Sequence, residues 1–278
     1  MRFNAESILR HKPPFCFIGA FDFFDEGGAE ADINPFDTLP AWIISPECSA
    51  LPVEFAAQLM GACSRLERDR EVKAGFLSKV KCFEWVSHPQ KIVRIRVEAG
   101  FSLGEFYDFT AQFIGVIGDV CAKLSATLYL SDNPVHQEGG ESLSAKPIIA
   151  KNSGSSVMSE LFLVNDGNVT GGQMDFFLNP DCPVYDGHFP GNPITPGVLL
   201  VDAMTEAACR LKGNNCEDKL QLVRLRDVVF QSLVFPGDNL LVKVRETQSS
   251  AMGFQNFTAS IFNSGKRCAR AKITLRSI

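Results

Sequence analysis

The chain has 278 residues, of which 45% are hydrophobic and 21% charged, enough for a sizeable buried core and comfortable for two domains. The formal net charge is −5 and no basic cluster stands out, which excludes the electrostatic footprint of a nucleic-acid-binding protein. The nine cysteines form no CxxC pair, which argues against a zinc site, and we expect them to be reduced core residues.

The N-terminal segment, MRFNAESILRHKPPF, has no apolar stretch of the kind that a secretory signal requires. The sequence also contains no apolar run of about 18 residues, so no transmembrane helix and no membrane partner are predicted. We therefore expect a cytoplasmic protein. His11 lies in this first segment, and we expect it to have a structural role.

Two long amphipathic helices are predicted, at 49–70 and at 197–212. Glu54 of the first helix aligns with Asp202 of the second, 148 positions later. Each helix is followed by runs in which hydrophobic and polar residues alternate, a pattern typical of half-buried antiparallel strands. Because the order of elements is the same in both halves, the sequence indicates an internal duplication.

A polar stretch with Gly and Pro separates the two repeats and is typical of a linker. We therefore predict a first half at 1–130, a linker at 131–147 and a second half at 148–278. One long helix followed by an antiparallel meander indicates an α+β fold in which the sheet wraps around the helix.

The most informative segment is YDGHFPGNPITPGVL, at 185–199, which leads directly into the second helix. Proline fixes φ and glycine allows φ values that other residues avoid, so such a loop has a defined path. It carries His188, a residue type suited to general-base catalysis near neutral pH. Gly197 begins the helix, where backbone N–H groups lack an intrahelical acceptor and can bind an oxygen that gains negative charge.

The stretch GHFPGNPITPGVLLVDAM resembles the signature of the 3-hydroxyacyl-[acyl-carrier-protein] dehydratases of bacterial fatty acid synthesis, which are hot-dog proteins. LRHKPPFCFI is similar to the opening segment of those enzymes, and each half follows their order of strands. The resemblance covers nearly the whole chain and implies a double hot-dog. In that family, each site takes its histidine from one subunit and its acidic residue from the helix of the other.

The resemblance implies that His188 removes the α-proton of a 3-hydroxyacyl thioester and that Glu54 protonates the departing hydroxyl group. Gln58, one helical turn after Glu54, could reach the same hydroxyl, and the amide of Gly197 would bind the thioester carbonyl. Because Glu54 lies in an apolar stretch, we expect burial to raise the pKa of its carboxyl group. Five further loop and helix residues are expected to contact the substrate: Phe189, Pro190, Gly191, Pro196 and Val198.

The two halves keep opposite parts of the site. The first half has Pro40 at the position of His188, and the second has Glu206 at the position of Gln58. This asymmetry predicts a pseudo-dimer within one chain, with one complete site. Asp202 is interpreted as a remnant of the lost site or as a residue that helps the fold.

The predicted reaction needs no cofactor and no metal. Its partner would be acyl carrier protein, which holds the substrate on 4'-phosphopantetheine, or acyl-CoA, in fatty acid, polyketide or polyunsaturated fatty acid synthesis. Two alternatives stay open: an enoyl-thioester hydratase or isomerase, and a non-catalytic acyl-binding module of a synthase. The sequence leaves undecided the acyl chain, the carrier, the pathway, whether the enzyme is free-standing, and whether it pairs further as a homodimer.

Overall fold

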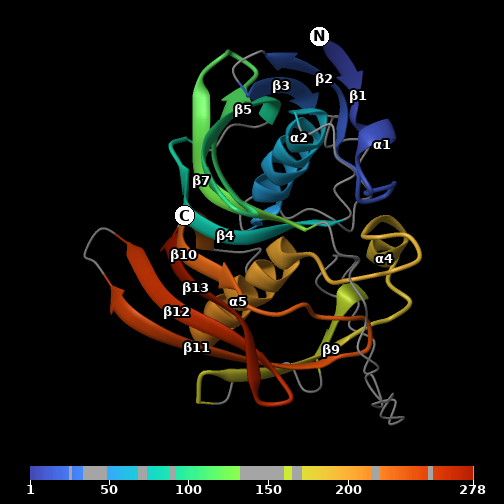
Figure 1. Ribbon diagram of the computed structural model, residues 1–278. Coiled ribbons are helices and arrows are strands. Elements are labelled where there is room, and N and C mark those ends of the chain that lie inside the picture. Colours follow the sequence, from blue (N-terminus) through green and yellow to red (C-terminus); the bar gives the residue numbers. More distant parts are fainter. Residues whose placement is uncertain are drawn as a thin grey trace.

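The computed structural model shows two long helices packed against one continuous antiparallel sheet (Figure 1). The predicted α+β class is confirmed. The predicted linker, apart from Ser131, and Pro40 lie outside the described residues. The structure describes the whole chain except residues 25–26, 34–48, 68–73, 88–91, 132–159, 165–170, 214–219, 250–252 and 278.

The first half contains the helix predicted at 49–70, which the structure describes as α2 from Leu51 to Glu67. The first turns of α2 are buried on all sides, which fits their uniformly apolar sequence. The described elements of this half are β1 (Arg2–Asn4), α1 (Ala5–Ile8), β2 (Ile18–Phe24), β3 (Gly28–Ile33), α2 (Leu51–Glu67), β4 (Ala74–Trp85), β5 (Ile92–Leu103), β6 (Phe106–Gly115) and β7 (Val120–Ser131).

The second half repeats this plan around the helix predicted at 197–212, which ends at Leu211. Its described elements are β8 (Phe162–Val164), β9 (Gln173–Leu178), α4 (Val184–Gly187), α5 (Gly197–Leu211), β10 (Leu220–Phe230), β11 (Asn239–Ser249), β12 (Phe254–Asn263) and β13 (Lys266–Ser277). The short helix α4 and the loop after it carry the Pro- and Gly-rich segment.

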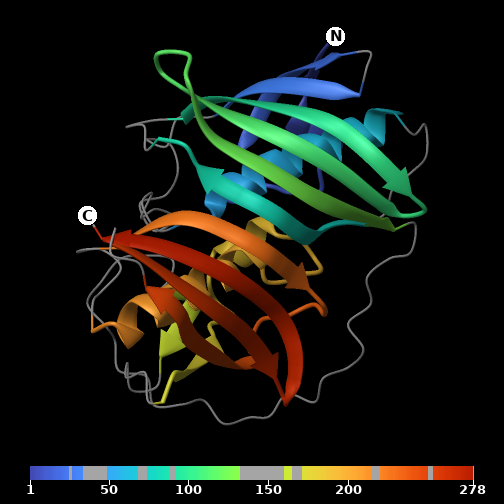
Figure 2. The ribbon, with the colours of Figure 1, turned by 90° about the vertical axis from the view of Figure 1, so that its left-hand side faces the viewer.

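The two halves join edge to edge through β4 and β10. The strand order is β1-β2-β3-β5-β6-β7-β4 in the first half and continues β10-β13-β12-β11-β9-β8 in the second. Val80 of β4 pairs with Val228 of β10 near the middle of this ladder. A pseudo-twofold axis passes close to this pair, and each half of the sheet curves around its own helix (Figure 2).

Each helix fills the concave side of its half, and phenylalanine supplies most of the largest buried side chains. Burying one such ring stabilises the fold by about 1.5–3 kcal/mol. Six described cysteines carry free thiols, whereas Cys209 is disulfide-bonded, so the expectation of reduced cysteines is wrong at that position. Spacing in the sequence cannot show which thiols meet in space. None of the described helices is long and apolar enough to cross a membrane.

Candidate active site

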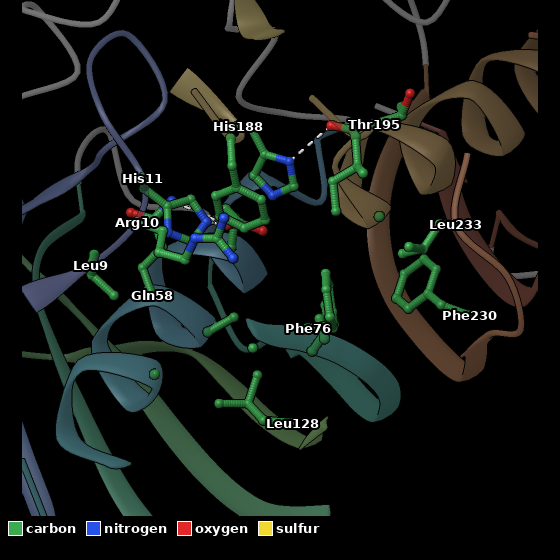
Figure 3. A pocket seen from close by; sticks show the side chains of 18 of the residues that line it. Leu9, Arg10, His11, Gln58, Phe76, Leu128, His188, Thr195, Phe230 and Leu233 are labelled. Carbon is green, nitrogen blue, oxygen red and sulfur yellow. Dashed lines mark hydrogen bonds and ion pairs between the residues drawn. The ribbon is translucent and has the colours of Figure 1, made fainter. Parts of the chain in front are cut away.

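A cavity opens between the two halves, and both halves contribute its walls (Figure 3). Its volume is about 920 Å³, including the part that is open to solvent. The first half contributes the loop after α1, one side of α2 and parts of β4 and β7. The second half contributes the loop before α5, the first turns of α5 and the end of β10 with the segment after it. His11 and His188 lie side by side in Figure 3, and Phe230 lies across the cavity from them.

His188 follows α4 directly, and its backbone N–H donates to the carbonyl oxygen of Val184 (3.0 Å). Its Nδ1 lies 2.9 Å from the carbonyl oxygen of Ile194. Because a carbonyl oxygen only accepts, Nδ1 carries the hydrogen of the neutral ring and Nε2 keeps a lone pair. Burial, and the charge of His11 nearby, lower the pKa of His188 to about 4. At neutral pH this ring is therefore uncharged and able to accept a proton.

Glu54 lies in the first turn of α2 and is only 5% exposed. Gln58 Nε2 donates both to Glu54 Oε1 and to the carbonyl oxygen of Phe15 (3.0 Å each). Gln58 Oε1 accepts the backbone N–H of Phe17 (3.0 Å). Both Nε2 hydrogens of Gln58 are therefore engaged. In this structure Gln58 holds the carboxyl group of Glu54, and its contact with a substrate hydroxyl stays a prediction.

A third titratable side chain, which the sequence predicted to be structural, completes the cluster. His11 Nε2 lies 3.3 Å from Glu54 Oε1, and the rings of His11 and His188 are 5.1 Å apart. The loop that carries His11 reaches the second half, where the backbone N–H of Lys12 donates to the carbonyl oxygen of Gly187 (3.1 Å). A Cβ atom at position 187 would clash with the Lys12 carbonyl oxygen. Glycine there allows the two halves to come this close.

The pKa of Glu54 is lowered, so the expectation of a raised value is wrong. Burial does raise the pKa of this carboxyl group, as the sequence suggested. The hydrogen bond and the charge of His11, together with the hydrogen bond from Gln58, outweigh that effect. The neighbour that reverses the direction comes from a loop more than forty positions away, which an apolar local sequence around Glu54 does not reveal.

The same three side chains have the chemistry of metal ligands. His11, Glu54 and His188 each offer one ligand atom, and these atoms all lie within 4.8 Å of one another. Two imidazoles and a carboxylate suit a divalent transition metal such as zinc. They are the residues of the described part of the chain that could hold an ion, and the metal-free reaction expected from the sequence stays a prediction.

Gly197 lines the cavity at the beginning of α5. The first helical hydrogen bond near it runs from the N–H of Leu199 to the carbonyl oxygen of Pro196 (3.1 Å). The N–H groups of Gly197 and Val198 come earlier, at positions for which a helix provides no acceptor. A Cβ atom on Gly197 would lie 2.9 Å from the ring of Phe230. The glycine therefore serves the packing of that ring as well as any approach of a ligand.

Phe189 is the other predicted contact that reaches the cavity. Its ring stacks on that of His188 at 4.2 Å between centroids and meets His11 nearly edge-on at 4.6 Å. The remaining four predicted contacts do not line the cavity, the first two being exposed and the last two buried: Pro190, Gly191, Pro196 and Val198. These four residues shape the loop and the beginning of α5, and their contact with a substrate stays a prediction.

Asp202, the counterpart of Glu54, binds the beginning of α2. Its Oδ1 accepts the N–H of Ala50 (2.6 Å) and its Oδ2 accepts the hydroxyl of Ser49 (2.9 Å). Ser49 and Ala50 are the counterparts, 148 positions earlier, of the first two residues of α5. The carboxyl group of Asp202 thus binds the backbone N–H of Ala50 at the beginning of α2. The counterpart of this group at the beginning of α5 is the backbone N–H of Val198. Burial raises the pKa of Asp202 to about 7, although these two hydrogen bonds act in the opposite direction.

Comparison with known proteins finds similarity to dehydratases. The family model described as ApeI-like, ApeI dehydratase, matches residues 166–270. The 3-hydroxyacyl-[acyl-carrier-protein] dehydratase FabZ of Wolbachia pipientis wMel is 35% identical over 95 residues, which are 33% of this chain and 66% of that protein. FabZ of Geobacter metallireducens is 33% identical over 96 residues, or 63% of its length. The chain thus spans just under two thirds of the length of these relatives.

Solved structures resemble the whole chain. A hot-dog protein of unknown function from Alicyclobacillus acidocaldarius has a TM-score of 0.57 and 12% identity, over 96% of this chain and 98% of the other. The dehydratase domain of RzxB from Pseudomonas fluorescens has a TM-score of 0.52 and 14% identity, over 96% and 99%. At these identities the likeness shows the fold alone. The resemblance predicted from the sequence is confirmed: the chain is a double hot-dog protein whose residues 166–270 match the ApeI-like dehydratase family, and it is similar to FabZ dehydratases over about a third of its length.

Proposed function

We propose that the protein removes water from a 3-hydroxyacyl thioester, held on acyl carrier protein or CoA, to give the trans-2-enoyl thioester in fatty acid or polyketide-type synthesis. One observation carries the proposal. His188 of the second half and Glu54 of the first converge on the same cavity. A ring nitrogen of His188 and a carboxylate oxygen of Glu54 lie within 4.8 Å of each other. The FabZ relatives are 3-hydroxyacyl-[acyl-carrier-protein] dehydratases, which are named for the same reaction type.

The elimination needs a base at the α-carbon, an acid at the β-oxygen and donors at the thioester carbonyl. Nε2 of His188 takes the α-proton, and the electron pair left behind forms the α–β double bond. The bond from the β-carbon to oxygen breaks, and the hydroxyl leaves as water with a proton supplied from Glu54. The amides of Gly197 and Val198 bind the carbonyl oxygen while it carries negative charge. Apolar side chains such as Phe76, which lines the cavity, face the acyl chain.

The alternatives differ in their products. An enoyl-thioester hydratase runs the same steps in reverse, and an isomerase would release a 3-enoyl thioester. A non-catalytic acyl-binding module would bind the carrier without changing the acyl group. The neutral His188 ring favours an enzyme, because a binding module has no need of a proton acceptor at the cavity wall.

Mass spectrometry of carrier-bound substrates tests the proposal. Wild type, His188→Ala and Glu54→Gln are each incubated with 3-hydroxyacyl-ACP and 3-hydroxyacyl-CoA of several chain lengths. We expect wild type to form a product lighter by one water, and each variant to be slower by about 10²–10⁴-fold. Asp186→Ala, an exposed position beside the loop, is the matched control and should turn over normally. No product from wild type with any substrate would overturn the proposal in favour of a binding module.

A further inference from the structure

The charge state of Glu54 leaves the acid of the proposed reaction without a proton of its own. The carboxyl group is buried, yet its pKa is lowered, chiefly because His11 opposes the effect of burial. A carboxylate cannot protonate a leaving hydroxyl. The proton must therefore be kept on a neighbouring group that can return it to Glu54 at the moment of reaction.

His11 is positioned to hold that proton. Its Nε2 is 3.3 Å from Glu54 Oε1, and its Nδ1 is buried without a hydrogen-bond partner. Among the described residues, Glu54 is thus the polar partner of the His11 ring. The other hydrogen-bond donor to Glu54 is the amide of Gln58, which does not titrate. His188 must be unprotonated to act as the base, so it cannot hold the same proton.

We propose that His11 and Glu54 act as one acid that holds a single proton, with His11 as the residue that positions and recharges Glu54. This inference rests on the proposed dehydratase function and assigns a further residue to its site. Either the proton resides on His11 Nε2 and Glu54 is charged, or it resides on Glu54 and both are neutral. Burial favours exchange between these two arrangements over loss of the proton to solvent.

The proton balance of one turnover closes within the cluster. The α-proton moves to His188, and the leaving hydroxyl takes a proton from Glu54, which takes one from His11 Nε2. After water leaves, His188 carries one extra proton and the pair lacks one. The rings of His188 and His11 are 5.1 Å apart, so one water molecule or a small ring movement suffices to return the proton to the pair. No further reactant is required.

Two arginines among the described residues lie near the pair. Arg10 lies on the same loop, with its guanidinium carbon 5.5 Å from the centre of the Phe189 ring. Arg65 of α2 also lines the cavity, and one of its guanidinium nitrogens donates to the carbonyl oxygen of Ile8. These two cations disfavour an added positive charge. The carboxylate of Glu54 is the group that compensates a protonated His11.

The pH dependence of His11→Gln separates a proton-holding role from a structural one. Glutamine keeps a polar group near Glu54 but cannot carry the proton, so the acid of the variant is the Glu54 carboxyl alone. We expect the alkaline limb of its kcat profile to move about one pH unit or more toward acid. The loss of kcat should be largest at alkaline pH and should shrink as the pH falls, because a growing fraction of the Glu54 carboxyl group is then protonated. A merely structural role predicts an equal loss at every pH.

A double-variant comparison provides the second readout. If the two residues form one acid, His11→Gln added to Glu54→Gln should slow turnover by less than threefold beyond Glu54→Gln alone. Fully multiplied losses, with an unshifted pH profile, would overturn the inference. Thermal melting of each variant identifies one that fails to fold, and His11→Asn is then used in place of His11→Gln. Failure of the proposed function is a separate outcome, because wild type itself would then form no dehydrated product.

Discussion

Three titratable residues share one buried site, so none of their protonation states can be assigned in isolation. His11 lies beside both Glu54 and His188, and it lowers the pKa of each. A positive charge on His11 favours an ionised carboxyl group and disfavours a second imidazolium. One residue therefore biases both partners toward the forms that the reaction needs at its start: a neutral base and an acid whose proton is held close by.

This coupling predicts the acid side of the activity profile. The base is active only while unprotonated, and the pKa of His188 is about 4. Turnover should therefore stay high down to roughly pH 5 and fall as the pH drops through about 4. In His11→Gln the neighbouring charge is gone, so we expect the pKa of His188 to rise. Measuring kcat/KM against pH and following the His188 ring protons by NMR checks both points. A wild-type limb near the ordinary histidine value would contradict the assignment.

The sequence predicts some of these residues better than others. His188 and Gly197 belong to one continuous motif, and Glu54 is recognisable because an acidic residue stands inside an apolar helix face. The role of His11 depends on a contact between halves, in which Lys12 bonds to Gly187. Nothing in the local pattern HKPPF indicates that docking. The direction of the Glu54 pKa was missed for the same reason, since burial is a local inference and the partner is not.

At the level of elements, the helices and their repeat are predictable because their apolar periodicity is local. The pairing of strands is not, since any strand of one half has several possible partners. Joining β4 to β10 leaves Val80 opposite Val228 and creates a single sheet across both halves. The role of Asp202 also becomes visible only from the packing of one helix against the other. Its carboxyl group accepts hydrogen bonds from the residues at the beginning of α2.

We expect Asp202 to make stability depend on pH. Its folded pKa of about 7 lies above the ordinary value of 3.8, so the folded chain binds the proton more tightly than the unfolded chain. This contribution is complete below about pH 4 and is lost as the pH rises toward about 7. Asp202→Asn removes the titration but keeps an acceptor for Ala50. The stability difference between wild type and Asp202→Asn should therefore shift by on the order of 1–4 kcal/mol between pH 4 and pH 8, wild type being favoured at low pH.

Urea denaturation at several pH values measures this difference. Asp202→Ala is the companion variant, because it leaves the N–H of Ala50 and the hydroxyl of Ser49 without their acceptor. It should lower the free energy of unfolding by about 1–3 kcal/mol. Parallel pH curves for wild type and Asp202→Asn would show that this carboxyl group does not titrate in the folded range.

For the whole molecule, the pseudo-twofold axis relates two positions that differ in structure. On one side of it, the first amides of α5 border a cavity with His188 and Glu54. On the other, the equivalent amide of α2 is bonded to Asp202. A symmetric pair of subunits would need both residues at both sites. A fused chain is free of that requirement. One half can supply the histidine and the other the glutamate, because the joined sheet holds the two halves in a fixed arrangement.

The fusion predicts one bound acyl chain per polypeptide. At the symmetry-related position, the N–H of Ala50 is already bonded to the carboxyl group of Asp202. The sequence also has Pro40 where the active half has His188. An acyl-pantetheine amide without a 3-hydroxyl group binds but cannot be dehydrated, so native mass spectrometry can count it. We expect a stoichiometry of one per chain, and one per chain again if two chains associate. Gly197→Val, which places bulk against Phe230 at the cavity wall, should abolish this binding, whereas Asp202→Asn should leave it unchanged. Two ligands per wild-type chain would mean that the second position still binds substrate, and the Asp202 contact would then have to open on binding.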